Sequence, residues 1–81
     1  MRMLLLSVFD SKVGAYMPLF ACHTKGEAIR SFSDACHDDK LPFRAHPGDF
    51  RLYLLAEFDN QTGFISSITP EPLIGADEVG G

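Results

Sequence analysis

The sequence predicts a small α+β domain, in which a three-stranded mixed sheet in the order β-α-β-β carries one helix packed on one face. Three observations predict it: a short apolar run near the N-terminus, one amphipathic segment with a capping sequence, and two apolar stretches separated by a turn sequence. A chain of 81 residues has room for a single core. We expect one domain at residues 1–70 and a loose acidic tail at residues 71–81.

The first strand is expected at residues 3–9, where the apolar run MLLLSVF ends at Asp10 and Ser11. Alternate positions of this run are apolar on both sides of the strand, which predicts a strand covered on both faces. Residues 10–22 are expected to form an irregular connection that folds back over the core, because several of them are too apolar to remain in water.

The helix is expected from Thr24 to Asp38. Thr24 can cap the first turn with its hydroxyl, and Glu27 can bond back toward the cap. The apolar residues of this segment recur at spacings of three and four and therefore share one face: Ala28, Ile29, Phe32, Ala35 and Cys36.

The second strand is expected at residues 50–58 and the third at residues 64–68, joined by the tight turn DNQTG with Gly63 at a positive φ. Pro70 and Pro72 are expected to end the third strand. The first two strands should lie parallel through a right-handed crossover, and the third should pair antiparallel with the second.

One helix can cover only one face of such a sheet. The other face would expose apolar side chains, drawn from Leu5, Phe9, Tyr53 and Leu55. Because an exposed apolar patch usually marks an interface, we expect a homo-oligomer, most simply a dimer packed through the sheet.

The formal charge of −4 argues against a protein that coats phosphate backbones nonspecifically. The acidic residues Asp10 and Asp59 stand at strand ends, where aspartate is an ordinary turn former, and the serines and glycines match no nucleophile elbow or phosphate loop. We therefore expect neither an enzyme nor a cofactor.

No apolar stretch is long enough to cross a membrane, and the N-terminal run is too short for a signal peptide, so a soluble intracellular protein without a membrane partner is expected.

Two Cys-His pairs, Cys22-His23 and Cys36-His37, supply four residue types that can bind zinc. A helix between them would hold the pairs roughly 20 Å apart, because each helical residue rises about 1.5 Å. One zinc ion or a disulfide within the chain would then be out of reach. We expect the cysteines to be structural, with a zinc site or an intersubunit contact as the alternatives.

The candidate nucleic-acid-binding residues are Lys40, Arg44, Arg51 and Arg30. Three aromatic residues lie near them in sequence and could stack on unpaired bases: Phe43, Phe50 and Tyr53. The alternative is a solvated basic loop beside aromatic residues of the core. Oligomerisation would gather several such patches on one face of an acidic chain.

Three segments resemble the small nonstructural protein of gokushovirus-type microviruses, which are tailless phages with circular single-stranded DNA genomes: SVFDSKVGAYMPLF, AIRSFSDACHD and HPGDFRLYLLAEFDNQTGFI. The resemblance extends from about Leu5 to Ile68. It implies a protein made in the cytoplasm of the infected bacterium, absent from the virion, and acting in genome synthesis or packaging. It implies no catalytic residues.

Two functions are therefore expected as alternatives. In the first, the protein binds single-stranded DNA through the basic face of an oligomer. In the second, it is a protein-interaction adaptor for the phage replication initiator, host replication proteins or the procapsid, without direct DNA binding, which its negative charge also fits.

Overall fold

The computed structural model describes residues 1–79 and confirms a small α+β fold. Its regular elements are β1 (Arg2–Asp10), β2 (Ala15–Tyr16), β3 (Phe20–Cys22), α1 (Lys25–Cys36), η1 (Pro47–Asp49), β4 (Phe50–Asp59), β5 (Ile65–Gly75) and η2 (Ala76–Glu78). The described residues form a five-stranded antiparallel sheet rather than the expected three-stranded mixed sheet. The two additional strands, β2 and β3, come from the segment that we expected to be irregular.

The central strand of the sheet is β1, which pairs with β4 on one side and with β2 and β3 on the other. The expected parallel pairing of the first two long strands is wrong, because β4 runs antiparallel to β1 with Asp10 opposite Phe50 and Arg2 opposite Asp59. The reason lies in β3, which returns the chain to the start of β1 and places Cys22 opposite Leu4. Consequently α1 connects the parallel strands β3 and β4, and β1 lies between them.

The helix begins as the sequence predicts. The hydroxyl of Thr24 accepts a hydrogen bond from the backbone N–H of Glu27 at 3.1 Å, which satisfies one of the free donors of the first turn. The Glu27 carboxylate accepts from the backbone N–H of His23 at 3.4 Å, one residue before the cap. The helix ends at Cys36, with His37 as its C-cap.

The core lies between α1 and one face of the sheet. The helix contributes Ala28, Phe32 and Cys36, which confirms the predicted buried stripe. Along β4, alternate residues are buried from Phe50 to Ala56, and Leu52 is completely buried, as is Leu6 on β1. Phe43 and Phe50 complete this core, with Phe43 tilted against Phe32 at a ring-centroid distance of 5.4 Å.

The C-terminal segment also differs from expectation. Strand β5 continues past Pro70 and Pro72 to Gly75, because β5 is an edge strand, where a missing N–H need not break the sheet. In η2, Ala76 is buried, and the N–H of Gly75 donates to the Glu78 carboxylate at 3.0 Å. The part of the expected loose tail that the structure describes is therefore ordered, and residues 80–81 lie outside the described residues.

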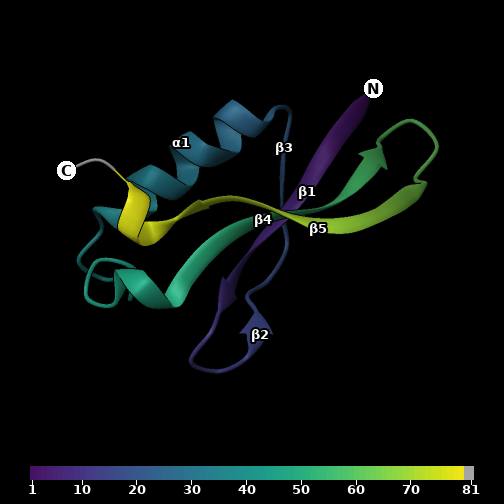
Figure 1. Ribbon diagram of the computed structural model, residues 1–81. Coiled ribbons are helices and arrows are strands. Elements are labelled where there is room, and N and C mark those ends of the chain that lie inside the picture. The colour runs from purple at the N-terminus through teal and green to yellow at the C-terminus, as the bar shows by residue number, and fades with distance from the viewer. Residues whose placement is uncertain (80–81) are drawn as a thin grey trace.

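The helix covers only one end of the sheet. Figure 1 shows α1 beside the C-terminal end of β5 and η2, whereas the β4–β5 hairpin and the start of β1 extend away from it. The molecule is accordingly elongated, with extents of 40 × 24 × 19 Å. The sheet thus has a free hairpin end and a face that no helix of the described chain covers.

Candidate functional site

Three aromatic rings from different strands meet on the face of the sheet opposite the core. Phe9 lies opposite Tyr16 in the pairing of β1 with β2, and their ring centroids are 4.9 Å apart. The Tyr53 ring contacts both of the others edge-to-face, at 6.3 Å from Phe9 and 5.7 Å from Tyr16. We call Phe9, Tyr16 and Tyr53 the aromatic triad.

The triad is accessible at its rim. Tyr16 is 42% exposed, while Phe9 and Tyr53 are half-buried. Below the rings, Ser7 is completely buried, and its hydroxyl donates a hydrogen bond to the carbonyl of Met17. That bond joins the segment after β2 to the central strand and supports the position of Tyr16.

A hollow of about 200 Å³ adjoins the triad. Phe9 and Tyr53 form its apolar wall, and its polar lining includes Arg51, Asp49 and Asp77. Arg51 lies opposite Phe9 in the sheet, so the two side chains project from the same face. A flat ring bearing hydrogen-bond donors fits this lining better than a phosphate group, because the carboxylates repel anions and accept hydrogen bonds.

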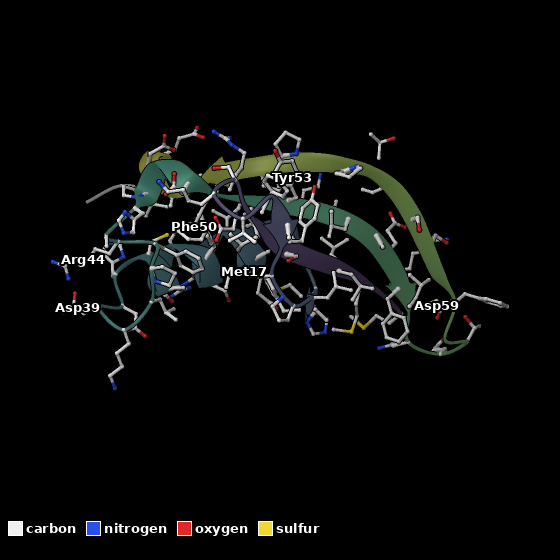
Figure 2. All side chains as sticks on the ribbon, turned by 90° about the horizontal axis from the view of Figure 1, so that it is seen from below. Met17, Asp39, Arg44, Phe50, Tyr53 and Asp59 are labelled. Atoms are coloured by element: carbon white, nitrogen blue, oxygen red, sulfur yellow. The ribbon has the colours of Figure 1, made fainter. Side chains whose placement is uncertain are left out.

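The four basic residues singled out in the sequence do not form one cluster through any contact in residues 1–79. Arg30 is exposed on α1, and Lys40 and Arg44 are exposed in the loop that follows it. Arg44 forms an ion pair with Asp39, and Figure 2 shows this pair at the opposite end of the molecule from Asp59. Arg51 forms an ion pair with Glu78 at 2.9 Å. Two of the four cations are therefore already neutralised by acidic neighbours.

The aromatic residues expected to accompany those cations are placed differently. Phe43 and Phe50 are 5% and 6% exposed and pack against each other at 4.8 Å, so neither ring can stack on a base. Tyr53 remains on the opposite face. Sequence reasoning missed Tyr16, since only the antiparallel β1–β2 pairing brings it to Phe9.

Cys22 and Cys36 are free, buried thiols at the two ends of the segment that contains α1. Burial raises the pKa of both thiols above the ordinary 9.0, and the carboxylate of Glu27 raises that of Cys22 further. Cys22 precedes the 12-residue helix and Cys36 ends it, and a helix of that length is about 18 Å long. Within residues 1–79, no three His, Cys, Asp or Glu side chains are grouped so that they could hold a metal ion.

An apolar hollow lies elsewhere, between α1 and the segment that follows β2. It measures about 270 Å³, and Met17, Phe32 and Phe43 contribute to its walls. Ser31 is the one lining residue with a polar side chain, so this hollow offers no acid, base or cation for chemistry.

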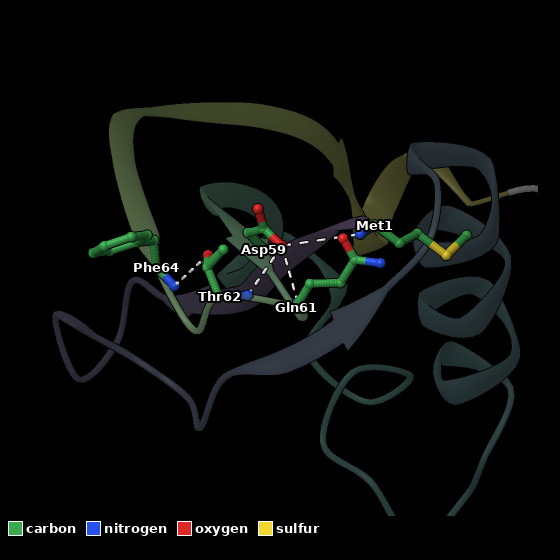
Figure 3. A network of polar contacts seen from close by, with 5 residues as sticks. All are labelled: Met1, Asp59, Gln61, Thr62 and Phe64. Atoms are coloured by element: carbon green, nitrogen blue, oxygen red, sulfur yellow. Dashed lines mark hydrogen bonds and ion pairs between the residues drawn. The ribbon is translucent and has the colours of Figure 1, made fainter.

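The turn between β4 and β5 is held by one carboxylate. Asp59 accepts hydrogen bonds from the backbone N–H groups of Gln61 at 2.9 Å and Thr62 at 3.4 Å, and the N-terminal amine of Met1 lies 3.9 Å away (Figure 3). These bonds lower the pKa of Asp59 below its ordinary 3.8, the bond from Gln61 most strongly. Gly63 has a φ of +81°, as its place in the turn requires. Asp59 is therefore a structural residue of the hairpin.

No helix in residues 1–79 is long and apolar enough to cross a membrane. No curated protein and no solved structure matches the chain significantly. The model of one protein family, described as Phage ORF5 protein, matches residues 3–79 and so runs from the second residue of β1 past the end of η2. The chain is a phage protein, and it belongs to the Phage ORF5 protein family.

Proposed function

We propose that this phage protein binds single-stranded DNA during genome synthesis or packaging, and that the aromatic triad is the surface on which unpaired bases stack. The supporting observation is the meeting of Phe9, Tyr16 and Tyr53 on a sheet face that α1 does not cover. Base stacking on aromatic side chains needs no sequence-specific contact, which suits a protein that must bind a whole genome.

Arg51 gives the proposed surface its cation. It projects from the same face as Phe9 and lines the adjoining hollow. Asp49 and Asp77 in that hollow can accept hydrogen bonds from the exocyclic amino group of a base. In the proposed complex, one base therefore lies in the hollow, a second base stacks on the exposed ring of Tyr16, and the backbone phosphate points toward Arg51.

The basic residues Lys40, Arg44 and Arg30 remain part of the proposal as peripheral phosphate contacts. All three are exposed, and Lys40 and Arg30 make no side-chain ion pair within residues 1–79. Because a net charge of −4 opposes phosphate binding, assembly of several copies would bring enough of these cations together. The proposed setting is the cytoplasm of a bacterium infected by a gokushovirus-type microvirus, with the protein absent from the virion.

Fluorescence anisotropy with a labelled oligonucleotide tests this function. Tyr53→Ala should weaken binding about 5- to 150-fold, since one stacked base contributes about 1–3 kcal/mol. Tyr53→Phe keeps the ring and should stay within about twofold of the wild type. Charge reversal at Lys40 or Arg44 should lower affinity and reduce its dependence on salt. No binding by the wild type at 50 mM salt would reject the proposal.

The second candidate is a protein-interaction adaptor in the same step. The Arg44–Asp39 and Arg51–Glu78 ion pairs favour it, because cations held by carboxylates are less available to phosphate. Affinity purification from infected cells after nuclease treatment should then recover the replication initiator, a host replication protein or a capsid protein. Recovery that disappears with nuclease would argue for DNA binding instead.

A further inference from the structure

Strand β5 is the open edge of the sheet. It pairs with β4 on one side, and no strand of the described chain pairs with its other side. An edge strand presents unpaired N–H and C=O groups to any chain that can lie alongside it, and proteins usually block such edges with charges, prolines or bulges. The two halves of β5 differ in this respect.

The second half of β5 is blocked. Pro70 and Pro72 remove two backbone donors, and Glu71 places a carboxylate there, which Lys25 pairs at 2.7 Å. The first half has no such charge or proline, because residues 60–70 contain no charged side chain and residues 61–69 contain no proline. The register of β5 against β4 is regular from Ile65 to Ser67, and its first shift lies between Ser67 and Glu71. The apolar residues Phe64 and Ile65 stand at its start, with exposed fractions of 74% and 60%.

The direction of the free backbone groups follows from the ladder. The N–H of Asp59 donates to the carbonyl of Phe64 at 2.9 Å, which places Phe64 in a hydrogen-bonded pair. Hydrogen-bonded and non-bonded pairs alternate in an antiparallel ladder. Ser66, opposite Glu57, therefore faces β4, whereas the N–H and C=O groups of Ile65 and Ser67 point to the open edge.

We propose that this edge is the dimer contact of the protein, with a second copy of the chain pairing antiparallel through residues 64–68 of its own β5. A two-fold axis beside Ser66 places Ile65 of each copy opposite Ser67 of the other. All four outward groups then pair across the interface, and the two sheets become one. The contact differs from the face-to-face packing expected from the sequence.

Charge leaves this edge open to a second copy and opposes contact elsewhere on the surface. Each chain carries −4, so two copies repel one another over most of their surfaces. Residues 60–70 carry no charge, and the carboxylates beside them on β4 have cationic partners, Arg2 for Glu57 and the Met1 amine for Asp59. The segment is also self-complementary, because a two-fold axis presents each exposed Ile65 to the same strand of the other copy. The proposed dimer does not require nucleic acid, so its test is independent of the test of the proposed function.

Sedimentation equilibrium of the whole chain without DNA tests the dimer. The wild type should have a mass near twice the 8.9 kDa of one chain at micromolar concentration. Ile65→Lys places a charge on the edge and should weaken dimerisation at least tenfold. Val13→Lys is the matched control, because Val13 is 75% exposed in the turn between β1 and β2, and it should leave the dimer unchanged.

Amide hydrogen exchange supplies a second readout that does not depend on a variant. In the dimer, the Ile65 and Ser67 amides should be protected from hydrogen exchange. Their protection factors should fall at least tenfold when the protein is diluted to the monomer. The Ser66 amide, which bonds to β4 within the chain, should change little. A wild-type monomer at micromolar concentration, a dimer unaffected by Ile65→Lys, or equal dilution effects on all three amides would each overturn the proposal.

Discussion

Arg51 on β4 and Glu78 in η2 form an ion pair at 2.9 Å, which ties the C-terminal turn to the start of a core strand. The same carboxylate accepts a hydrogen bond from the N–H of Gly75 at 3.0 Å. Gly75 lies opposite Arg51 in the sheet, and a Cβ there would lie 2.5 Å from the Asp77 carboxylate and in tight contact with the Arg51 guanidinium and the Glu78 carboxylate at 3.1 and 3.2 Å. This cluster orders a segment whose composition alone indicates a loose tail.

Arg51 has an ion pair with Glu78 and a proposed contact with phosphate, and replacing Glu78 with glutamine separates the two. The amide oxygen keeps the acceptor for Gly75, so the free energy of unfolding should fall by less than about 1 kcal/mol, as for other exposed ion pairs. Arg51 loses its counter-charge, and affinity for an oligonucleotide should rise about two- to fivefold.

Glu71→Gln is the control, because it removes an equal charge from an ion pair with Lys25 of α1, and Glu71 lies opposite Leu54, on the face of the sheet away from the aromatic triad. It should change oligonucleotide affinity less than Glu78→Gln does. Equal effects of the two variants would remove Arg51 from the proposed surface. Urea denaturation measures the free energy of unfolding, and fluorescence anisotropy measures the oligonucleotide affinity.

Leu52 tests the core. It is completely buried between α1 and the sheet, so Leu52→Ala should lower the free energy of unfolding by about 2–5 kcal/mol. Leu19→Ala, at a side chain that is 59% exposed, should cost less than about 1 kcal/mol. Urea unfolding followed by circular dichroism compares them, and similar losses would contradict the assigned core.

Asp59 makes the stability of the hairpin depend on pH. Its folded pKa lies below the ordinary 3.8, chiefly because the Gln61 N–H bonds the carboxylate. Its contribution is therefore present above the unfolded pKa and is lost as the pH falls through the folded pKa. The difference in melting temperature between wild type and Asp59→Asn should be largest near neutral pH and should shrink below about pH 4.

Asp34→Asn serves as the comparison for that series, because the Asp34 carboxylate is exposed on α1 and accepts no hydrogen bond within residues 1–79. It measures the effect of removing one exposed carboxylate that holds no backbone group. A constant Asp59→Asn difference from pH 7 to pH 2 would refute the role of this carboxylate.

Cys22 and Cys36 should react slowly with thiol reagents in the native protein. Both thiols are buried, and their raised pKa values leave little thiolate at neutral pH. Labelling with a thiol-specific reagent at pH 7.5 should be slow without denaturant and should reach two groups per chain in 6 M urea. Rapid native labelling of either cysteine would contradict its place in the core.

The candidate site could be predicted only in part. Tyr53 and Arg51 are recognisable in the sequence as an aromatic and a cation on the same strand face. Phe43 and Phe50 have equal aromatic character, yet they lie in the core, and no local pattern distinguishes them from Tyr53. The triad joins residues 9, 16 and 53, and the two-residue strand β2 that supplies Tyr16 has no periodicity to detect.

By itself the sequence determined the helix, its Thr24 cap and its buried stripe, and also the β4–β5 hairpin with Gly63 in its turn. These features depend on interactions between residues a few positions apart, which a local pattern records. The tertiary structure alone decided the direction of β4 against β1, the ordering of the C-terminal segment and the assembly of the aromatic triad. Each of these depends on pairing between distant segments, where β3 reverses the chain before α1 and Glu78 reaches Arg51.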